Sequence, residues 1–297
     1  MAGRRAIGRD VHFYYFGEPD KALGGLILNP SVTKKNFLSM LGILIVASGR
    51  YRVTLRSTGH DLTPTDEPLQ PGQYDIRPYS RKDAISITDE PCILRIISQS
   101  STGRDYIFRT QVRERDGKCV ITGTVNRRAD RDNWSGFHAA HIFPLSSEDY
   151  FVQFGYSRWI TNRIGERDTG INSCQNGLLM QSNIHELFDG FYFSINPDDG
   201  YKITCFDEDN SRIDGKYLTL VRDELLRWHF RQAVLANMRV AGEPSFETDF
   251  PPGTDMMGEI LSGPAAAKRM EAELFSRLGG YFLPGTLKSL EDNYNPA

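Results

Sequence analysis

The sequence is poor in cysteine and has no strong net charge. Only four cysteines occur among 297 residues, and none belongs to a C-x-x-C pair (Cys92, Cys119, Cys174 and Cys205). The spacing therefore does not indicate a four-cysteine zinc knuckle, and scattered single cysteines are typical of a reducing compartment. The formal net charge is −3. Any surface that binds nucleic acid must therefore be local.

Long hydrophobic runs and nucleotide-binding signatures are also absent from the sequence. The first residues do not include the apolar segment of a secretory signal. The longest apolar stretch, 38–47, is about half of a membrane span. Neither G-x-x-x-x-G-K-[ST] nor G-x-G-x-x-G occurs. We expect an intracellular protein, nuclear or cytoplasmic, that has no membrane partner.

The composition and the pattern of the chain predict an α+β fold. Hydrophobic residues make up 39% of the sequence and charged residues 25%, as in globular proteins, and the length suffices for two domains. We divide the chain into four parts. These are a β-rich domain with one helix, a linker, a central domain and a helical extension, at residues 1–97, 98–104, 105–210 and 211–297.

The N-terminal part alternates between strand and helix signals. Residues 11–16 and 26–28 favour strands because they are β-branched, aromatic or aliphatic. A helix that begins near Ser31 or Thr33 follows, with apolar residues at helical spacing. Further strands are expected at 51–55, 73–76 and 85–87. This order resembles the ubiquitin-like folds by analogy.

A basic segment lies before the motifs of the central domain. Residues 101–131 hold eight Lys or Arg and four acidic residues. Clustered positive charge is what phosphate binding requires, so Arg113, Arg115 and Lys118 are candidate nucleic-acid contacts. A solvated helix face of mixed sign explains the same charges equally well. Both interpretations stay open from the sequence.

The central domain contains three short motifs that carry, in order along the chain, a His, an Asn, and a His with an Asp. His141 lies in the apolar run Ala-Ala-His-Ile, which predicts a strand that ends before Pro144. Asn176 begins the run Asn-Gly-Leu-Leu. His185 and Asp189 lie four residues apart in a short predicted helix, so their side chains share one face. An imidazole nitrogen and a carboxylate oxygen on that face can hold one cation.

These residue types suit the hydrolysis of a phosphodiester bond. The reaction needs a base for the attacking water and positive charge for the phosphoryl oxygens and the leaving group. A neutral imidazole, with a pKa of about 6.5, can be the base at cellular pH. Each residue alone is more typical of packing, a surface hydrogen bond or a turn. The signal lies in their combination and spacing.

The combination of Ala-His-Ile, Asn-Gly-Leu-Leu and His-x-x-Phe-Asp before an aromatic strand resembles the HNH endonucleases, which share a ββα-metal fold. The match runs from about 119 to 206, and its flanks are similar to fungal proteins with this domain. The resemblance implies that His141 is the general base and that Asn176 holds the loop through backbone hydrogen bonds. It implies that His185 binds a divalent metal (Mg²⁺, Mn²⁺ or Zn²⁺), with Asp189 as a second ligand. The two histidines are then expected to face each other, and nucleic acid, DNA before RNA, is the expected substrate.

The chain departs from the best-known HNH proteins at Ala140. The residue before the base is Asp or His in those proteins and binds the metal, which alanine cannot do. His138 lies two residues earlier on the same strand face. From there it could reach either the metal or a phosphate, and we count it among the candidate nucleic-acid contacts. Two functions stay open. One is a metal-dependent endonuclease, and the other is an inactive HNH-fold module that binds nucleic acid or protein; either could form a homo-oligomer.

Overall fold

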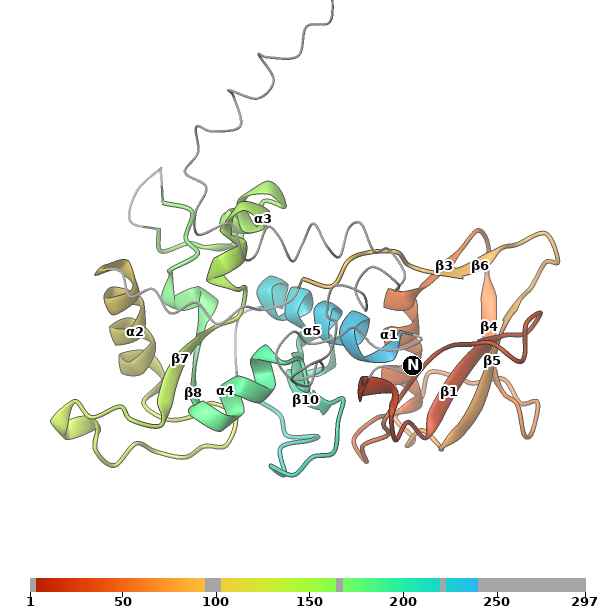
Figure 1. Ribbon diagram of the computed structural model, residues 1–297, viewed down its shortest axis with the longest axis horizontal. Coiled ribbons are helices and arrows are strands. Elements are labelled where there is room, and N and C mark those ends of the chain that lie inside the picture. Colours follow the sequence, from red (N-terminus) through yellow and green to blue (C-terminus); the bar gives the residue numbers. More distant parts are fainter. Residues whose placement is uncertain (1–3, 94–102, 164–167, 220–222, 240–297) are drawn as a thin grey trace, which may run out of the picture.

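The structure, a computed structural model, describes residues 4–93, 103–163, 168–219 and 223–239. It confirms a mixed α+β protein. Figure 1 shows a β-sheet with helix α1 at one end of the molecule, a strand pair between helices α2 and α4 at the other end, and helix α5 between them. Most of the expected linker and the chain beyond 239 lie outside the described residues. None of the described helices has the length and apolarity that a membrane crossing requires.

The N-terminal region is a four-stranded sheet covered by one helix. The strands are β1 (Val11–Tyr15), β2 (Ala22–Leu26), β4 (Tyr51–Leu55) and β5 (Gly72–Pro78), in the order β2-β1-β5-β4. The central strands β1 and β5 run parallel, and each outer strand is antiparallel to its neighbour. The short strands β3 (Ile45–Ala47) and β6 (Ile85–Ile87) form a separate antiparallel pair.

Helix α1 (Lys34–Leu44) begins directly after Thr33, one of the two cap residues that the sequence indicated. Thr33 is its N-cap and accepts a hydrogen bond from the backbone of Asn36, whose side chain accepts one from the Thr33 backbone. This capping box satisfies amide groups that have no partner inside the helix. The helix buries Phe37 and Leu41 against the sheet. The second strand, expected at 26–28, lies earlier in the chain, at 22–26.

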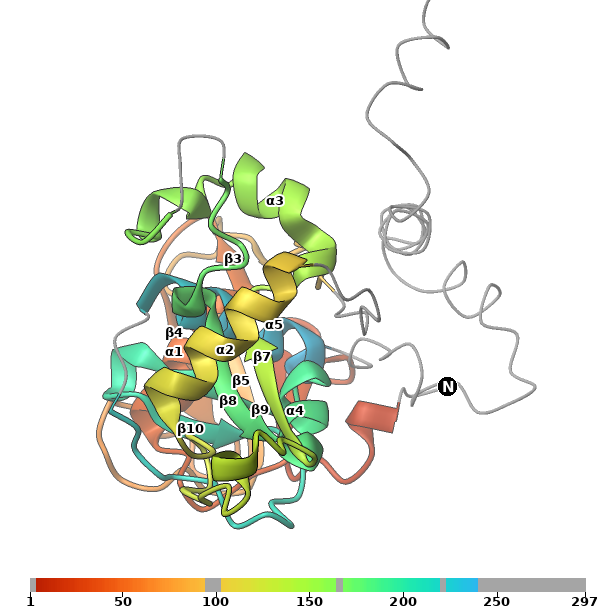
Figure 2. The ribbon, with the colours of Figure 1, turned by 90° about the vertical axis from the view of Figure 1, so that its left-hand side faces the viewer.

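The central region contains the elements that carry the motifs. They are helix α2 (Gly103–Asp116), strand β7 (Phe137–His141), helix α3 (Glu148–Gln153), strand β8 (Gly177–Gln181), helix α4 (Ser182–Asp189), and strands β9 (Phe193–Asn196) and β10 (Lys202–Cys205). Strands β7 and β8 pair antiparallel, as do β9 and β10. Figure 2 shows α2 crossing in front of the β7–β8 pair, with α4 beside it.

Helix α5 (Asp223–Met238) packs into both hydrophobic cores. Its first half contributes Leu226 and Trp228 to the core under the central region. Its second half contributes Phe230 and Val234 to the core under the N-terminal sheet. At its end the helix approaches Gly24 so closely that a Cβ there would lie 2.0 Å from a backbone oxygen. The part of the expected helical extension that the structure describes therefore belongs to the folded body of the protein.

Candidate functional site

The site is built on the β7–β8 pair, whose register determines where each histidine points. His138 pairs with Met180, Ala140 with Leu178, and His141 with Gly177. Because successive side chains alternate between the faces of a strand, His141 lies on one face and His138 with Ala140 on the other. Helix α2 packs against the first face and α4 against the second.

His141 lies between helix α2 and the loop before β8. Its ring stacks on Phe108, with centroids 3.9 Å apart and planes 7° apart. Its Nε2 is 3.2 Å from Oδ1 of Asn172. Gly177, opposite His141, permits this packing because a Cβ there would lie 2.6 Å from Phe108. No motif in the sequence marks Phe108 or Asn172, since only the tertiary packing brings them to His141.

Asn176 is fully buried and connects two loops through its side-chain amide. Its Oδ1 accepts a hydrogen bond from the backbone nitrogen of Phe143 at 2.8 Å. Its Nδ2 donates to the backbone oxygens of Phe143 and Ile171, both at 2.9 Å. An amide can do this because it both donates and accepts. The chain that leaves β7 just after His141 is thereby fixed to the loop before β8.

On the opposite face of β7, three polar side chains form a chain of contacts. Nδ1 of His138 is 3.1 Å from Nδ1 of His185, and the two rings stand at 89°. Nε2 of His185 is 3.0 Å from Oδ2 of Asp189, one turn further along α4. The partial burial of the His138 ring lowers its pKa below the ordinary value, and the nearby charge of His185 lowers it further. This shift favours the neutral ring, which is the form that binds metals.

The structure thus brings His138, His185 and Asp189 together on one face of β7 and places His141 on the other face. The expectation that His141 and His185 face each other is wrong for this arrangement. The physical reason is that β7 remains regular through its last residue, so the three-residue step from His138 to His141 reverses the face. Asn176 lies between the two loops and contacts neither histidine side chain in the hydrogen bonds described above.

The basic candidates occupy different environments. Arg115 donates to the backbone oxygens of Cys174 and Gly177, the latter at 2.7 Å, and pairs with the neighbouring Asp116. It therefore fastens α2 to the start of β8. Arg113 lies over the ring of Trp134, 4.9 Å from its centroid. Lys118 is exposed.

As arranged here, the site is not a closed metal centre. Within the described ranges, no three His, Cys, Asp or Glu side chains are placed to hold one metal ion. The geometry explains this, because His138 and Asp189 approach different nitrogens of His185. The donor types themselves fit a divalent cation, since imidazole suits Zn²⁺ and carboxylate suits Mg²⁺ and Mn²⁺.

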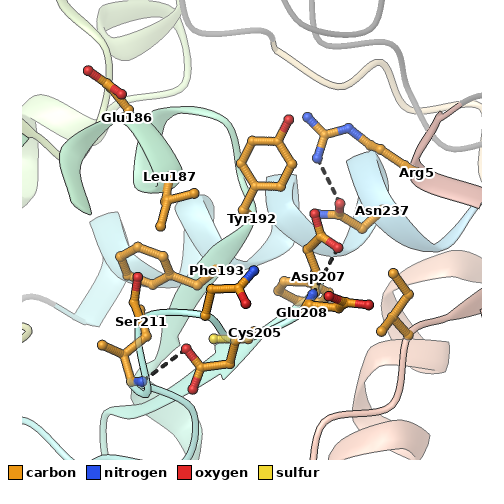
Figure 3. Close-up of a pocket in the computed structure, with 15 residues that line it drawn as sticks. Arg5, Glu186, Leu187, Tyr192, Phe193, Cys205, Asp207, Glu208, Ser211 and Asn237 are labelled. Atoms are coloured by element: carbon orange, nitrogen blue, oxygen red, sulfur yellow. Dashed lines mark hydrogen bonds between the residues drawn. The ribbon is translucent and has the colours of Figure 1, made fainter. Parts of the chain in front are cut away.

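A cavity of about 390 Å³ lies beyond α4, between β10 and the N-terminal segment. Figure 3 shows Arg5 reaching Asn237 on one side of it, with Tyr192 close by. Its lining also carries four acidic residues, Glu186, Asp207, Glu208 and Asp209. This excess of negative charge disfavours a phosphate ligand. Among the described residues that line it, none is a predicted site residue.

Two family models match separate parts of the chain. Residues 8–82 match a model described as a domain of unknown function (DUF8573). Residues 119–196 match a model described as HNH endonuclease. The second match contains β7, β8 and α4, and with them every histidine and carboxylate of the site. No curated protein and no solved structure matches the chain.

Proposed function

We propose, from the match of residues 119–196 to a family model described as HNH endonuclease, that this chain is a metal-dependent endonuclease that hydrolyses phosphodiester bonds in nucleic acid, with DNA as the preferred substrate. The observation that carries the proposal is the contact between His138, His185 and Asp189 on one face of β7. Imidazole and carboxylate side chains can bind divalent metals, and these three lie inside the segment that matches the family model. The order β7, β8, α4 supports a ββα-metal core.

In the proposed mechanism, His185 holds a divalent cation (Mg²⁺, Mn²⁺ or Zn²⁺), and His138 and Asp189 lie within reach of its two nitrogens. The bound cation would supply positive charge for the phosphoryl oxygens and for the leaving oxygen. Asn176 keeps the end of β7 in place. Arg113 and Lys118 are the proposed phosphate contacts of the surrounding surface.

We propose His141, the last residue of β7, as the general base that takes a proton from the attacking water. Because its ring lies on the face of β7 opposite His185, this role requires that the bound phosphate be reached from both faces at the end of the strand. Nε2 of His141 faces the amide oxygen of Asn172, which can only accept a hydrogen bond. This contact favours the tautomer with the proton on Nε2, so that Nδ1 is the basic nitrogen of the neutral ring. The stacked Phe108 ring holds the imidazole plane in one orientation.

A specific observation favours the alternative function, an inactive module that binds nucleic acid or protein. Ala140 is 1% exposed, and its methyl group takes up the position from which a ligand would point toward α4. The N-terminal sheet would then serve binding or targeting. Its order β2-β1-β5-β4, with parallel central strands, supports the ubiquitin-like analogy for that region.

Plasmid nicking by the full chain distinguishes the two functions. We expect cutting with added Mg²⁺, Mn²⁺ or Zn²⁺ that EDTA abolishes. His141→Ala should lose about 10²- to 10⁴-fold of the rate while it keeps DNA affinity, and circular dichroism checks that the loss of its stacking contact with Phe108 leaves the chain folded. His60→Ala, at an exposed position in the N-terminal region, is the matched control. Tight DNA binding without cutting under every cation would support the inactive module instead.

A further inference from the structure

We propose that His138 and His185 hold the cation through their two Nδ1 atoms, and that Asp189 orients His185 without binding the metal itself. The inference rests on the proposed function, because it assigns the ligands of that same site. It departs from the interpretation of the sequence, which paired His185 with Asp189 as ligands. The inference is based on the two nitrogens of His185, because His138 approaches Nδ1 and Asp189 approaches Nε2.

The first step concerns the proton on His185. An ionised carboxylate only accepts hydrogen bonds, and Oδ2 of Asp189 is 3.0 Å from Nε2 of His185. The proton of a neutral His185 ring is therefore on Nε2, and the lone pair is on Nδ1. Histidines that bind metals commonly donate their other ring proton to a carboxylate in this way, which fixes both tautomer and ring orientation.

The second step concerns the distance between the two histidines. The Nδ1 atoms are 3.1 Å apart. Two imidazole nitrogens bound to one ion at about 2.0–2.1 Å are roughly 3–3.4 Å apart for ligand angles between octahedral and tetrahedral values. The observed separation already matches this requirement. In the structure a single proton can join the two nitrogens, and a cation would take its place.

The third step concerns why the strand ligand is His138. Only side chains of the face toward α4 can reach His185, and β7 presents two residues there, His138 and Ala140. The methyl group of Ala140 is buried and has no donor atom. His138 is exposed and spans the distance to α4. Two protein ligands leave coordination positions for water and for a substrate phosphate, and a catalytic ion keeps at least one position open.

Calorimetric titration of Mn²⁺ and Zn²⁺ into the full chain tests these assignments, with the visible spectrum of bound Co²⁺ as a second measurement. His138→Ala and His185→Ala should each weaken cation binding by more than about 100-fold. Asp189→Asn keeps an acceptor oxygen for Nε2 and should weaken binding by about 10- to 100-fold, the usual effect of an orienting partner. His60→Ala should bind as the unaltered chain does.

The inference is overturned if His138→Ala binds the cations with unchanged affinity, or if Asp189→Asn weakens binding more than His138→Ala does. Because His138 is exposed, its replacement is compatible with folding, which circular dichroism verifies. Plasmid nicking by the same samples separates this outcome from failure of the proposed function. A His138→Ala variant that still binds cations and still cuts refutes the ligand assignment alone, whereas an unaltered chain that neither binds nor cuts refutes both.

Discussion

Replacing Asn176 tests how much of the site depends on one buried amide. Asn176→Ala removes three hydrogen bonds, one from the backbone nitrogen of Phe143 and two to the backbone oxygens of Phe143 and Ile171. Each contributes about 0.5–1.5 kcal/mol net, and each backbone group left without a partner in the interior adds to the cost. We therefore expect a loss of about 3–5 kcal/mol in the free energy of unfolding.

Asn176→Asp tests the hydrogen bonds more specifically, because aspartate has the same shape as asparagine and changes only the donor groups and the charge. Its carboxylate can still accept from the backbone nitrogen of Phe143, but two donor positions become acceptors that face backbone oxygens. It also places a charge at a fully buried position. The loss of stability should equal or exceed that of Asn176→Ala.

Urea denaturation followed by tryptophan fluorescence measures both variants. Asn210→Ala, at an exposed position, is the control and should change the free energy of unfolding by less than about 0.5 kcal/mol. If both Asn176 variants lose less than about 1 kcal/mol, the hydrogen bonds do not hold the loops as we infer. Because Phe143 follows His141 by two residues, the destabilised variants should also lose cleavage.

Three further outcomes follow from contacts in the central region. Gly177→Ala should lower the free energy of unfolding by about 1–3 kcal/mol, since its methyl group would overlap helix α2; a stable variant would contradict this packing. Arg115→Ala should destabilise the chain by about 1–3 kcal/mol because it loses hydrogen bonds to two backbone oxygens, whereas Lys118→Ala should mainly weaken DNA binding. Urea denaturation measures the stability of both variants, and a filter-binding assay measures their affinity for DNA. Burial, aided by nearby carboxylates, raises the pKa of the Cys205 thiol far above its ordinary value. Iodoacetamide should therefore label half-buried Cys174 first and Cys205 only after the chain unfolds, and peptide mass spectrometry measures this order.

Local signals in the sequence predicted several elements because those elements are determined locally. Thr33 caps α1 through its own side chain. The turn between β9 and β10 contains Pro197 and Gly200, and the latter has φ of +64°, so the hairpin was recognisable from its turn residues. Helix α4 (Ser182–Asp189) is the short helix that the sequence predicted around His185 and Asp189.

Strand β8 was missed because its sequence does not alternate. Leu178, Leu179 and Met180 are all buried, since helices cover both faces of the β7–β8 pair, and the Asn-Gly pair before them indicated a turn. Without β8 there was no register, so the sequence could not show which face of β7 meets α4. A signal was nevertheless present, because residues three apart on a strand, such as His138 and His141, point to opposite faces.

Helix α5 has a consequence for any attempt to divide the protein. Its sixteen residues complete the interior of both matched segments, 8–82 and 119–196, although they belong to neither. A fragment that stops before Asp223 would expose apolar surface in each half. We expect the two halves to unfold in a single cooperative thermal transition. We also expect that neither half folds when it is fused to another protein without this helix.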